Sequence, residues 1–223
     1  MATSTVENYL KTLYLEQRHE DGEMVPMGRL AAAMSVVPGT ATSMVKALAD
    51  SGLVAYEPRG GVKLTASGER LALHVLRRHR LVELFLVKVL GLDWSEVHDE
   101  ADHLEHAISD IVLERLDALL GHPTVDPHGD PIPTAKGHLH EPELLNLTDC
   151  PICVPQRIAR VVDQSPSFLQ FIERQGLMPG STVTVEKREP AAEAVKIRVP
   201  RKAEVSLGLA AAAKILVEAV DAR

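Results

Sequence analysis

Hydrophobic positions near the start of the chain recur at helical spacing. Steps of three and four residues place them on one face of a helix that is predicted to end at about His19. Ser4 and Glu7 form the S-x-x-E pattern that typically caps the start of a helix. The apolar positions are Val6, Tyr9, Leu10, Leu13 and Tyr14.

Two short helices and a β-hairpin are predicted next. The segment "MGRLAAAM" is followed by the break "SVVPG" and by a helix from about Gly39 to Asp50, which Gly52 ends. The β-prone pieces "LVAYEP" and "GVKLT" flank "RGG", which indicates a hairpin with a basic tip. This order of elements is that of a winged helix-turn-helix domain, expected over residues 1–72. The inward positions of the third helix are Ala41, Met44, Val45 and Leu48.

Two long amphipathic helices are predicted after the hairpin. The first begins at Thr65 and runs to Leu90, and the second is expected to run without a break over residues 97–120. Because little else covers them, they indicate a helical dimerisation unit over residues 73–140. The apolar stripe of the second helix consists of Ile108, Ile111, Val112, Leu116 and Leu119.

The C-terminal part is predicted to be a small β-barrel. Pro, Gly and His are frequent from Gly121 to about Pro155, which marks a domain boundary with a linker over residues 141–155. Short β-type segments then fit an SH3-like barrel over residues 156–223. Strands are expected at 157–163, 181–189 and 194–200, and helices at 165–176 and near 208–220. The fold class is therefore mainly α, with a small C-terminal barrel.

The composition of the chain limits the cellular compartment in which we expect the protein. The chain has 223 residues, 45% of them hydrophobic, which is enough to bury a core. No apolar run reaches the roughly 18 to 20 residues of a membrane span, and the start lacks the layout of a secretion signal, so we expect a cytoplasmic protein without a membrane partner. The only cysteines, Cys150 and Cys153, form one C-x-x-C pair. With His138 and His140 they can supply a zinc site, the alternative being a loop with reduced thiols.

Charge is distributed unevenly along the chain. The net charge of -7 argues against nucleic acid, but residues 24–80 hold eight basic and three acidic residues. That segment therefore carries +5 and the remainder -12. A basic segment in an acidic protein is compatible with a DNA-reading domain joined to a body that binds cations.

The segment "VHDEADHLEHAISD", residues 97–110, holds three histidines and five carboxylates. In a helix, Asp102, Glu105 and His106 share one face, and the preceding helix carries a histidine four residues before a glutamate. Such faces are usually solvated, but helical bundles also build internal metal sites in this way. A hydrolase with a catalytic metal is a further alternative, although no Ser-His-Asp order, phosphate loop or nucleotide fingerprint supports it.

These residues resemble the diphtheria toxin repressor family of metal-dependent transcriptional regulators over almost the whole chain. The most specific pieces are "RRHRLVELFLVKVLGLDWSEVHDEADHLEHAISDIVLERL" and "PHGDPIP". The pieces "ENYLKTLYL", "VPGTATSMVKALADSGLV" and "YEPRGGVKLTASG" are most similar to the manganese transport regulator branch. The resemblance implies no enzyme. It implies a homodimeric, metal-activated repressor that binds palindromic double-stranded operators, with a C-terminal domain of the FeoA-like kind.

The resemblance also implies two metal sites. A regulatory site would use Asp102, Glu105 and His106, with Asn8 from the first helix. An ancillary site would use His79, Glu83 and His98 with acceptors from the barrel, for which Asp163 and Gln164 are the nearest candidates.

The implied donors favour Mn²⁺. Iron-responsive relatives have Cys and Met at the positions of Asp102 and Asn8, whereas this chain has oxygen donors there, which suit manganese. Small manganese regulators have Asp and Glu at the positions of Asn8 and Lys11, so Lys11 cannot serve in their paired-metal arrangement. Fe²⁺ is the alternative, and other divalent metals can substitute in vitro. A metal-storage or adaptor protein is a further alternative, but it would not need the basic winged segment.

For DNA, the third helix is expected to enter the major groove and the hairpin to touch phosphate. Small hydroxyl side chains carry little base specificity, so the operator sequence does not follow. Metal binding is expected to tie the first helix to the long helices and thereby set the spacing of the two recognition helices. The DNA-binding candidates are Arg29, Pro38, Gly39, Thr40, Thr42, Ser43, Lys46, Arg59 and Lys63.

Overall fold

The structure is a computed structural model of the whole chain, and it describes residues 3–19, 23–200, 202 and 204–220. The chain divides into two compact units. The first comprises residues 1–79, 102–113 and 133–139, and the second comprises residues 80–101, 114–132 and 140–223. No helix in the described ranges is long and apolar enough to cross a membrane.

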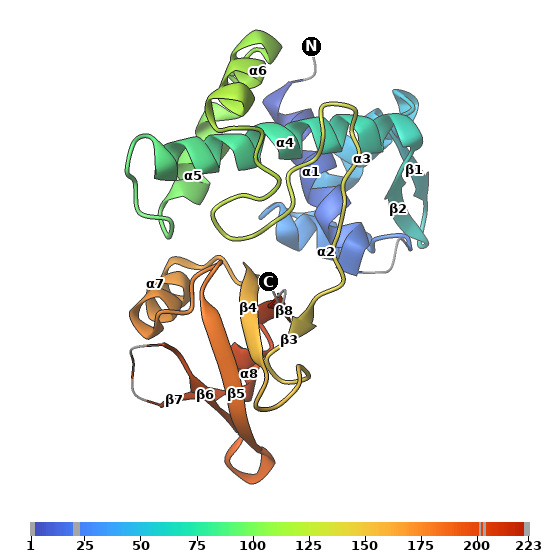
Figure 1. Cartoon of the computed structure of the whole chain (residues 1–223). Helices are drawn as coiled ribbons and strands as arrows, with labels where there is room; N and C mark the ends of the chain where they lie inside the picture. The colour runs from blue at the N-terminus through green and yellow to red at the C-terminus, as the bar shows by residue number, and fades with distance from the viewer. Residues whose placement is uncertain (1–2, 20–22, 201, 203, 221–223) are drawn as a thin grey trace. The chain divides into compact units, whose positions relative to one another are not determined.

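The first unit begins with the winged helix-turn-helix arrangement that the hydrophobic pattern predicts (Figure 1). Its antiparallel wing pairs Val54 with Leu64. The apolar faces of the helices and wing form one core around the fully buried Leu10, Leu30, Val45 and Val62. The elements are α1 (Ser4–His19), α2 (Met27–Ala33), α3 (Pro38–Asp50), β1 (Val54–Glu57) and β2 (Gly61–Leu64).

The predicted capping box at the start of α1 is wrong. The backbone N–H of Glu7 donates to the carbonyl oxygen of Thr3 at 3.0 Å, and the hydroxyl of Thr3 accepts from the N–H of Val6 at 3.4 Å. The carboxylate of Glu7 is thereby left for contacts elsewhere in the unit, with Arg78 and His106.

Helix α4 (Ala66–Lys88) confirms the first long helix. As expected, Thr65 caps its start, because its hydroxyl accepts from the N–H of Gly68 at 3.2 Å. The helix is buried along much of its length, and it carries both His79 and Glu83.

The predicted unbroken helix over residues 97–120 is wrong. Helix α5 (Val97–Leu104) ends in a turn, and α6 (Asp110–Leu119) starts anew after Ser109. The hydroxyl of Ser109 accepts from the N–H of Val112 at 3.4 Å, which favours a new helix start over continuation. Glu105 and His106 therefore lie on the turn between the two helices rather than on a helix face.

The C-terminal part of the second unit is a six-stranded sheet with the order β3-β8-β4-β5-β6-β7, and Figure 1 shows α7 beside it. Neighbouring strands of this sheet pair antiparallel, and the core contains the fully buried Ile158, Leu169, Val185 and Ile215. The strands are β3 (Leu145–Asn146), β4 (Pro155–Val161), β5 (Thr182–Glu189), β6 (Ala194–Arg198), β7 (Val205–Gly208) and β8 (Ile215–Ala219).

The predicted strands and the helix α7 (Pro166–Gln175) are confirmed, as is the mainly α fold with a β-rich C-terminal domain. The predicted helix near residues 208–220 is mostly wrong. Only the single turn α8 (Leu209–Ala212) forms, because Ile215 and Val217 instead pair with β4 and are buried in the core of the sheet. A short 3-10 turn, η1 (Pro190–Ala192), joins β5 to β6.

Candidate metal centre

The first unit brings three predicted ligands together. His79, Asp102 and Glu105, called the first cluster below, offer ligand atoms that lie within 4.8 Å of one another. Nδ1 of His79 lies 2.6 Å from Oε2 of Glu105 and 3.1 Å from Oδ1 of Asp102. Glu105 is fully buried, whereas the side chain of Asp102 is 44% exposed and gives the cluster an opening to solvent.

The ammonium group of Lys11 lies inside the first cluster. Nζ donates to Oδ1 of Asp102 at 2.7 Å and to the two oxygens of Glu105 at 2.8 and 2.9 Å. It also lies 3.4 Å from Nδ1 of His79. A positive charge from α1 therefore balances the carboxylates of this cluster.

The pKa of Asp102 follows from these contacts. Burial alone would raise it, but the hydrogen bond from His79 and the charge and hydrogen bond of Lys11 outweigh burial and hold the pKa well below its usual range. Asp102 is thus an anionic oxygen donor at neutral pH.

The predicted ligands His106 and Asn8 lie beside this cluster. Nε2 of His106 is 2.7 Å from Oδ1 of Asn8 and 3.3 Å from Oε1 of Glu105, so an amide, an imidazole and a carboxylate converge there. Nδ1 of His106 is 2.6 Å from Oε2 of Glu7, whose other oxygen accepts from Arg78 at 2.8 Å. Burial would raise the pKa of Glu7, but the hydrogen bonds and charges of Arg78 and His106 outweigh burial and lower it.

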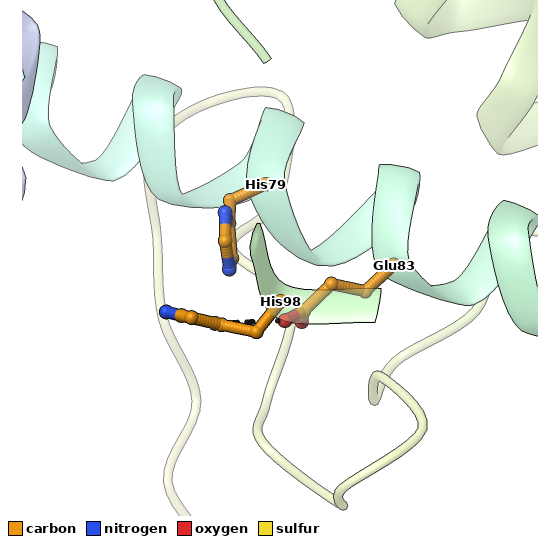
Figure 2. A group of neighbouring side chains, drawn as sticks. All are labelled: His79, Glu83 and His98. Carbon is orange, nitrogen blue, oxygen red and sulfur yellow. Dashed lines mark hydrogen bonds and ion pairs between the residues drawn. The ribbon is translucent and has the colours of Figure 1, made fainter. Parts of the chain in front are cut away.

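The predicted ancillary ligands Glu83 and His98 are also in contact. Nδ1 of His98 is 3.2 Å from Oε1 of Glu83, and Figure 2 shows the two side chains turned toward each other, with His79 one turn earlier on α4. Glu83 is almost fully buried, whereas the side chain of His98 is half exposed. The pair therefore joins α4 to the start of α5.

The second unit contains a group of potential ligands of which the sequence patterns indicated only Glu83. Glu83, Asp126 and His128, called the second cluster below, are all buried and offer ligand atoms within 4.8 Å of one another. Two carboxylates and one imidazole in a water-poor interior are a donor set for a divalent cation.

The tautomer of His128 is set by its surroundings. Nε2 lies 2.8 Å from the carbonyl oxygen of Trp94, which can only accept, so Nε2 carries the hydrogen. In the neutral imidazole, Nδ1 then carries a lone pair; it is fully buried without a hydrogen-bond partner among the described residues and lies 4.0 Å from Oε2 of Glu83. A lone pair turned toward a carboxylate is unfavourable unless a cation lies between them, so the geometry fits a bound metal ion.

Residues 124–132 form a tight loop that holds Asp126 and His128 in place. Oδ1 of Asp126 accepts from the backbone N–H groups of His128 and Asp130 at 2.8 and 2.9 Å. The carbonyl of His128 accepts from the N–H of Val161 on β4 at 2.9 Å. Gly129 has a φ of +89°, and a Cβ there would lie 1.9 Å from the carbonyl oxygen of Ala159, so this loop needs glycine.

The pKa of Asp126 is strongly raised. Burial is the largest cause, and the nearby charges of Asp130 and Glu83 add to it, while Arg80 acts in the opposite direction. A cation in the second cluster would relieve this crowding of negative charge.

The predicted barrel ligands have other partners. Asp163 accepts from Lys214 at 2.7 Å, and Gln164 donates to Oδ2 of Asp130 at 2.6 Å. Gln164 therefore supports the loop of the second cluster through Asp130, and among the described residues Asp163 is in no group of three potential ligands. The same holds for Cys150, which is buried in the sheet core, and for Cys153, which is exposed.

Most DNA-binding candidates lie on exposed positions of α3 and the wing, Arg29 lies on α2, and Thr42 is half-exposed. Ala41, Val45 and Leu48 are buried, which leaves the opposite face of α3 in solvent. The hydroxyls of Thr42 and Ser43 donate to carbonyl oxygens one turn earlier at 2.8 and 3.0 Å, which leaves them only as acceptors for any further hydrogen bond. The exposed candidates are Arg29, Pro38, Gly39, Thr40, Ser43, Lys46, Arg59 and Lys63.

Part of the basic segment is internal, which corrects the charge argument. Arg77 and Arg80 donate to the carbonyl oxygens of Pro133 and Pro131, Arg78 pairs with Glu7, and all three are buried. These arginines stabilise the loop and α1 and are not available to phosphate. Arg29, although exposed, pairs with Glu16.

Sequence reasoning missed Glu7, Lys11, Asp126 and His128. The sequence pattern places Glu7 in a capping box, and it gives Lys11 only as a position without a ligand side chain. For the last two, a signal was present in "DPHGD", where a carboxylate and an imidazole two residues apart precede a glycine in an otherwise irregular segment.

Comparison with known families agrees with this architecture. Residues 1–62 match the family described as "Iron dependent repressor, N-terminal DNA binding domain", and residues 65–134 match "Iron dependent repressor, metal binding and dimerisation domain". Residues 145–219 match the FeoA domain.

Individual relatives cover nearly the whole chain. The iron-dependent repressor IdeR of Mycobacterium leprae (strain TN) is 32% identical over 228 residues, which is 97% of each chain. A solved structure described as a manganese-dependent transcriptional repressor in complex with manganese is 38% identical, with a TM-score of 0.84 over 96% of this chain and 100% of the other. The structure of ScaR with bound Cd²⁺ is 34% identical, with a TM-score of 0.79 over 96% and 99%.

The chain is thus a metal-dependent, DNA-binding transcriptional repressor and not an enzyme. It belongs to the diphtheria toxin repressor family, in the form that carries a C-terminal FeoA domain.

Proposed function

We propose that this repressor responds to manganese and binds palindromic operator DNA as a homodimer. The observation that carries the choice of metal is the second cluster, where Nδ1 of His128 lies 4.0 Å from Oε2 of Glu83 and Asp126 offers a further oxygen within 4.8 Å. The donors are oxygen and imidazole without sulfur, because both cysteines lie outside the two clusters. Such donor sets suit Mn²⁺, whereas thiolate and thioether donors select softer ions.

In this proposal each cluster holds one ion. Glu83, Asp126 and His128 would hold one, with the half-exposed His98 as a further donor. Asp102, Glu105 and His106 would hold the other with Asn8, and His79 is within reach of Glu105. The ion would supply positive charge that fixes the donors of α1 and α5 in one arrangement.

DNA binding is assigned to the exposed face of α3, with Lys46 as its cation, and to the wing residues Arg59 and Lys63. Arg59 has a φ of +71° at the tip of the wing, which turns the chain between β1 and β2. These cations would bind phosphate and orient α3 in the major groove.

Dimerisation is assigned to α6. The side chains of Ile111 and Leu119 are 74% and 65% exposed, and Val112 is also exposed. An apolar stripe of this kind on a helix is typical of a subunit interface, and two copies would place two recognition helices on one operator.

Fe²⁺ is the second candidate metal, favoured by the similarity to the iron-dependent repressor of Mycobacterium leprae. Solved relatives are described with manganese, Cd²⁺ and Zn²⁺, so binding of several divalent ions in vitro is expected here too.

A selection experiment separates these candidates. Metal-free protein is mixed with a library of randomised duplexes, and bound DNA is recovered with Mn²⁺, with Fe²⁺ under anaerobic conditions, or with chelator. The recovered duplex is then titrated at buffered free metal concentrations. The free metal concentration needed for operator binding is compared with the level of each metal in cells. If this concentration is lower for Mn²⁺ than for Fe²⁺ on that scale, the result supports manganese. The reverse order assigns the protein to iron, and recovery of the same duplex in chelator contradicts metal control.

A further inference from the structure

The position of Lys11 on α1 carries an inference beyond metal binding itself, which rests on the proposed function. Its ammonium nitrogen lies 2.7 Å from Asp102 and 2.8 and 2.9 Å from the two oxygens of Glu105. With Nδ1 of His79 at 3.4 Å, one ammonium contacts all three members of the first cluster. All these residues belong to the first unit.

Lys11 is buried, which is unusual for lysine. Lysine is almost never fully buried unless it is paired, and here Glu105 is fully buried and Asp102 is half-buried beside it. Its neighbour Arg78 is bound to Glu7, so among the contacts of the described residues Lys11 is the cation that balances Glu105. A second ionised carboxylate beside Glu105 would be strongly unfavourable without such a charge.

The ammonium and a metal ion require the same oxygens. A divalent ion binds carboxylate oxygens at roughly 2.0–2.6 Å and would lie between Asp102 and Glu105, where Nζ now lies. Two cations this close together repel each other strongly in a low-dielectric interior. Occupation of the first cluster by a metal ion therefore requires Lys11 to leave, and its flexible four-carbon stem allows the ammonium to move to solvent.

We propose that Lys11 is a built-in cation that competes with the metal for Asp102 and Glu105, and thereby raises the metal concentration at which the first cluster fills. In the second cluster the cation beside Asp126 is Arg80, which donates to the carbonyl of Pro131 and lies 3.8 Å from Asp126, too far for the direct hydrogen bonds that Lys11 makes in the first cluster. The two clusters therefore fill at different metal concentrations, the second before the first. Because α1 also carries Glu7 and Asn8, both in contact with His106, exchange of Lys11 for metal changes how α1 is held.

Calorimetric titration of the full chain with Mn²⁺ tests this competition. The variants are Lys11→Met, which keeps the stem and removes the charge, and Lys187→Met, a matched control at an exposed ion pair with Glu189. In Lys11→Met, we expect one class of sites to tighten about tenfold or more, which corresponds to about 1.4 kcal/mol of lost competition, and the other class to stay unchanged. If one class of Mn²⁺ sites binds too weakly to detect in the natural chain and becomes measurable in Lys11→Met, the result supports the proposal equally. Adding Asp102→Asn to Lys11→Met should abolish the gain.

Two further results overturn the proposal. Two Mn²⁺ classes in the natural chain that keep their constants in Lys11→Met reject competition by Lys11 and leave manganese binding intact. Tightening in Lys187→Met to the same extent shows a general charge effect and also rejects it. Absence of Mn²⁺ binding in every variant would instead reject the proposed function. If Lys11→Met does not fold, as judged by thermal unfolding, Lys11→Gln replaces it with the same expectations.

Discussion

The imidazole of His128 stacks on the indole of Trp94 with ring centroids 5.5 Å apart, and its Nε2 donates to the backbone carbonyl of the same residue at 2.8 Å. These two contacts fix both the plane and the tautomer of the ring, as partners of metal-binding histidines generally do. The nitrogen left over, Nδ1, is the one that faces Glu83.

Replacing His128 by Asn should remove one class of Mn²⁺ sites. Asn keeps a smaller polar side chain but lacks the fixed imidazole lone pair. The measurement is the number of Mn²⁺ ions bound per chain by electron paramagnetic resonance of the free ion. Trp94→Phe is the control, because it retains the backbone carbonyl and a ring to stack on, and it should keep the class. If His128→Asn binds as many Mn²⁺ ions as the natural chain, the assignment of His128 as a metal ligand is contradicted.

The raised pKa of Asp126 predicts a pH dependence of stability without metal. At pH values between its ordinary pKa and the raised folded value, the folded state holds a proton that the unfolded state has lost. The free energy of unfolding therefore falls as pH rises through this window. Asp126→Asn cannot ionise, so it should unfold at a higher temperature than the natural chain at neutral pH in chelator.

The same variant should lose stabilisation by Mn²⁺. A ligand that binds only the folded state stabilises by RT ln(1 + [L]/Kd), about 2.7 kcal/mol at 100 times Kd. Thermal unfolding with and without Mn²⁺ measures this, with the exposed Asp50→Asn as control. A metal-induced rise that is as large in Asp126→Asn as in the natural chain would show that the ion binds elsewhere.

Gly129→Ala should destabilise the second unit more than Gly180→Ala. Both glycines have nearly the same φ, +89° and +88°, but a Cβ at Gly129 meets the carbonyl of Ala159 at 1.9 Å and one at Gly180 meets nothing within 4 Å. The left-handed backbone costs about 1–3 kcal/mol in each variant, and the clash should add about 1–3 kcal/mol or more at Gly129. Chemical denaturation of both proteins in chelator measures the difference, and equal losses would contradict the role of the close contact.

Lys46→Ala and Lys63→Ala should weaken DNA binding on all sequences alike. Each cation that contacts phosphate contributes about 0.9 to the slope of log K against log salt concentration, so each variant should flatten the slope by about that amount. Fluorescence anisotropy of the selected duplex at several salt concentrations gives the slope. Lys187→Ala on β5 is the control and should leave the slope unchanged. An unchanged slope in Lys46→Ala and Lys63→Ala would show that α3 and the wing do not contact DNA phosphate.

Ile111→Glu should produce a folded monomer. The side chain is 74% exposed within one chain, so a charge there costs little in folding but would be buried in an α6 interface. Sedimentation equilibrium measures the mass, and circular dichroism checks the helices. Val154→Glu, at another exposed valine, should leave the dimer intact. A dimer that persists in Ile111→Glu would place the interface elsewhere.

The sequence was sufficient for elements with a clear periodic pattern. The spacing of Leu10 and Leu13 predicts α1, and Thr65 correctly begins α4. The pattern failed where a local signal competed with periodicity, as at Ser109, which restarts the helix, and at Ile215, which pairs with β4 because its neighbours bury it. Local spacing carries no information on such tertiary partners.

For the metal centre, helical spacing and family resemblance indicated Asp102, Glu105 and Glu83, which the structure brings into the two clusters. They did not single out His128, although the segment "PHGDPIP" contains it, because the nitrogen that His128 leaves for a metal is set by the carbonyl of Trp94, 34 residues away. They also could not place Lys11, whose ammonium reaches Glu105 across 94 residues of sequence. Helix positions follow from local spacing, whereas the partners of His128 and Lys11 are set by contacts that form only when the chain folds.

The most direct test of the account is the affinity of the natural chain for its selected operator with chelator and with saturating Mn²⁺, by fluorescence anisotropy at fixed salt. Coupling between metal and DNA sites is typically about 1–3 kcal/mol, so we expect Mn²⁺ to tighten operator binding roughly 5- to 150-fold. Equal dissociation constants under the two conditions would contradict metal control of DNA binding by this chain.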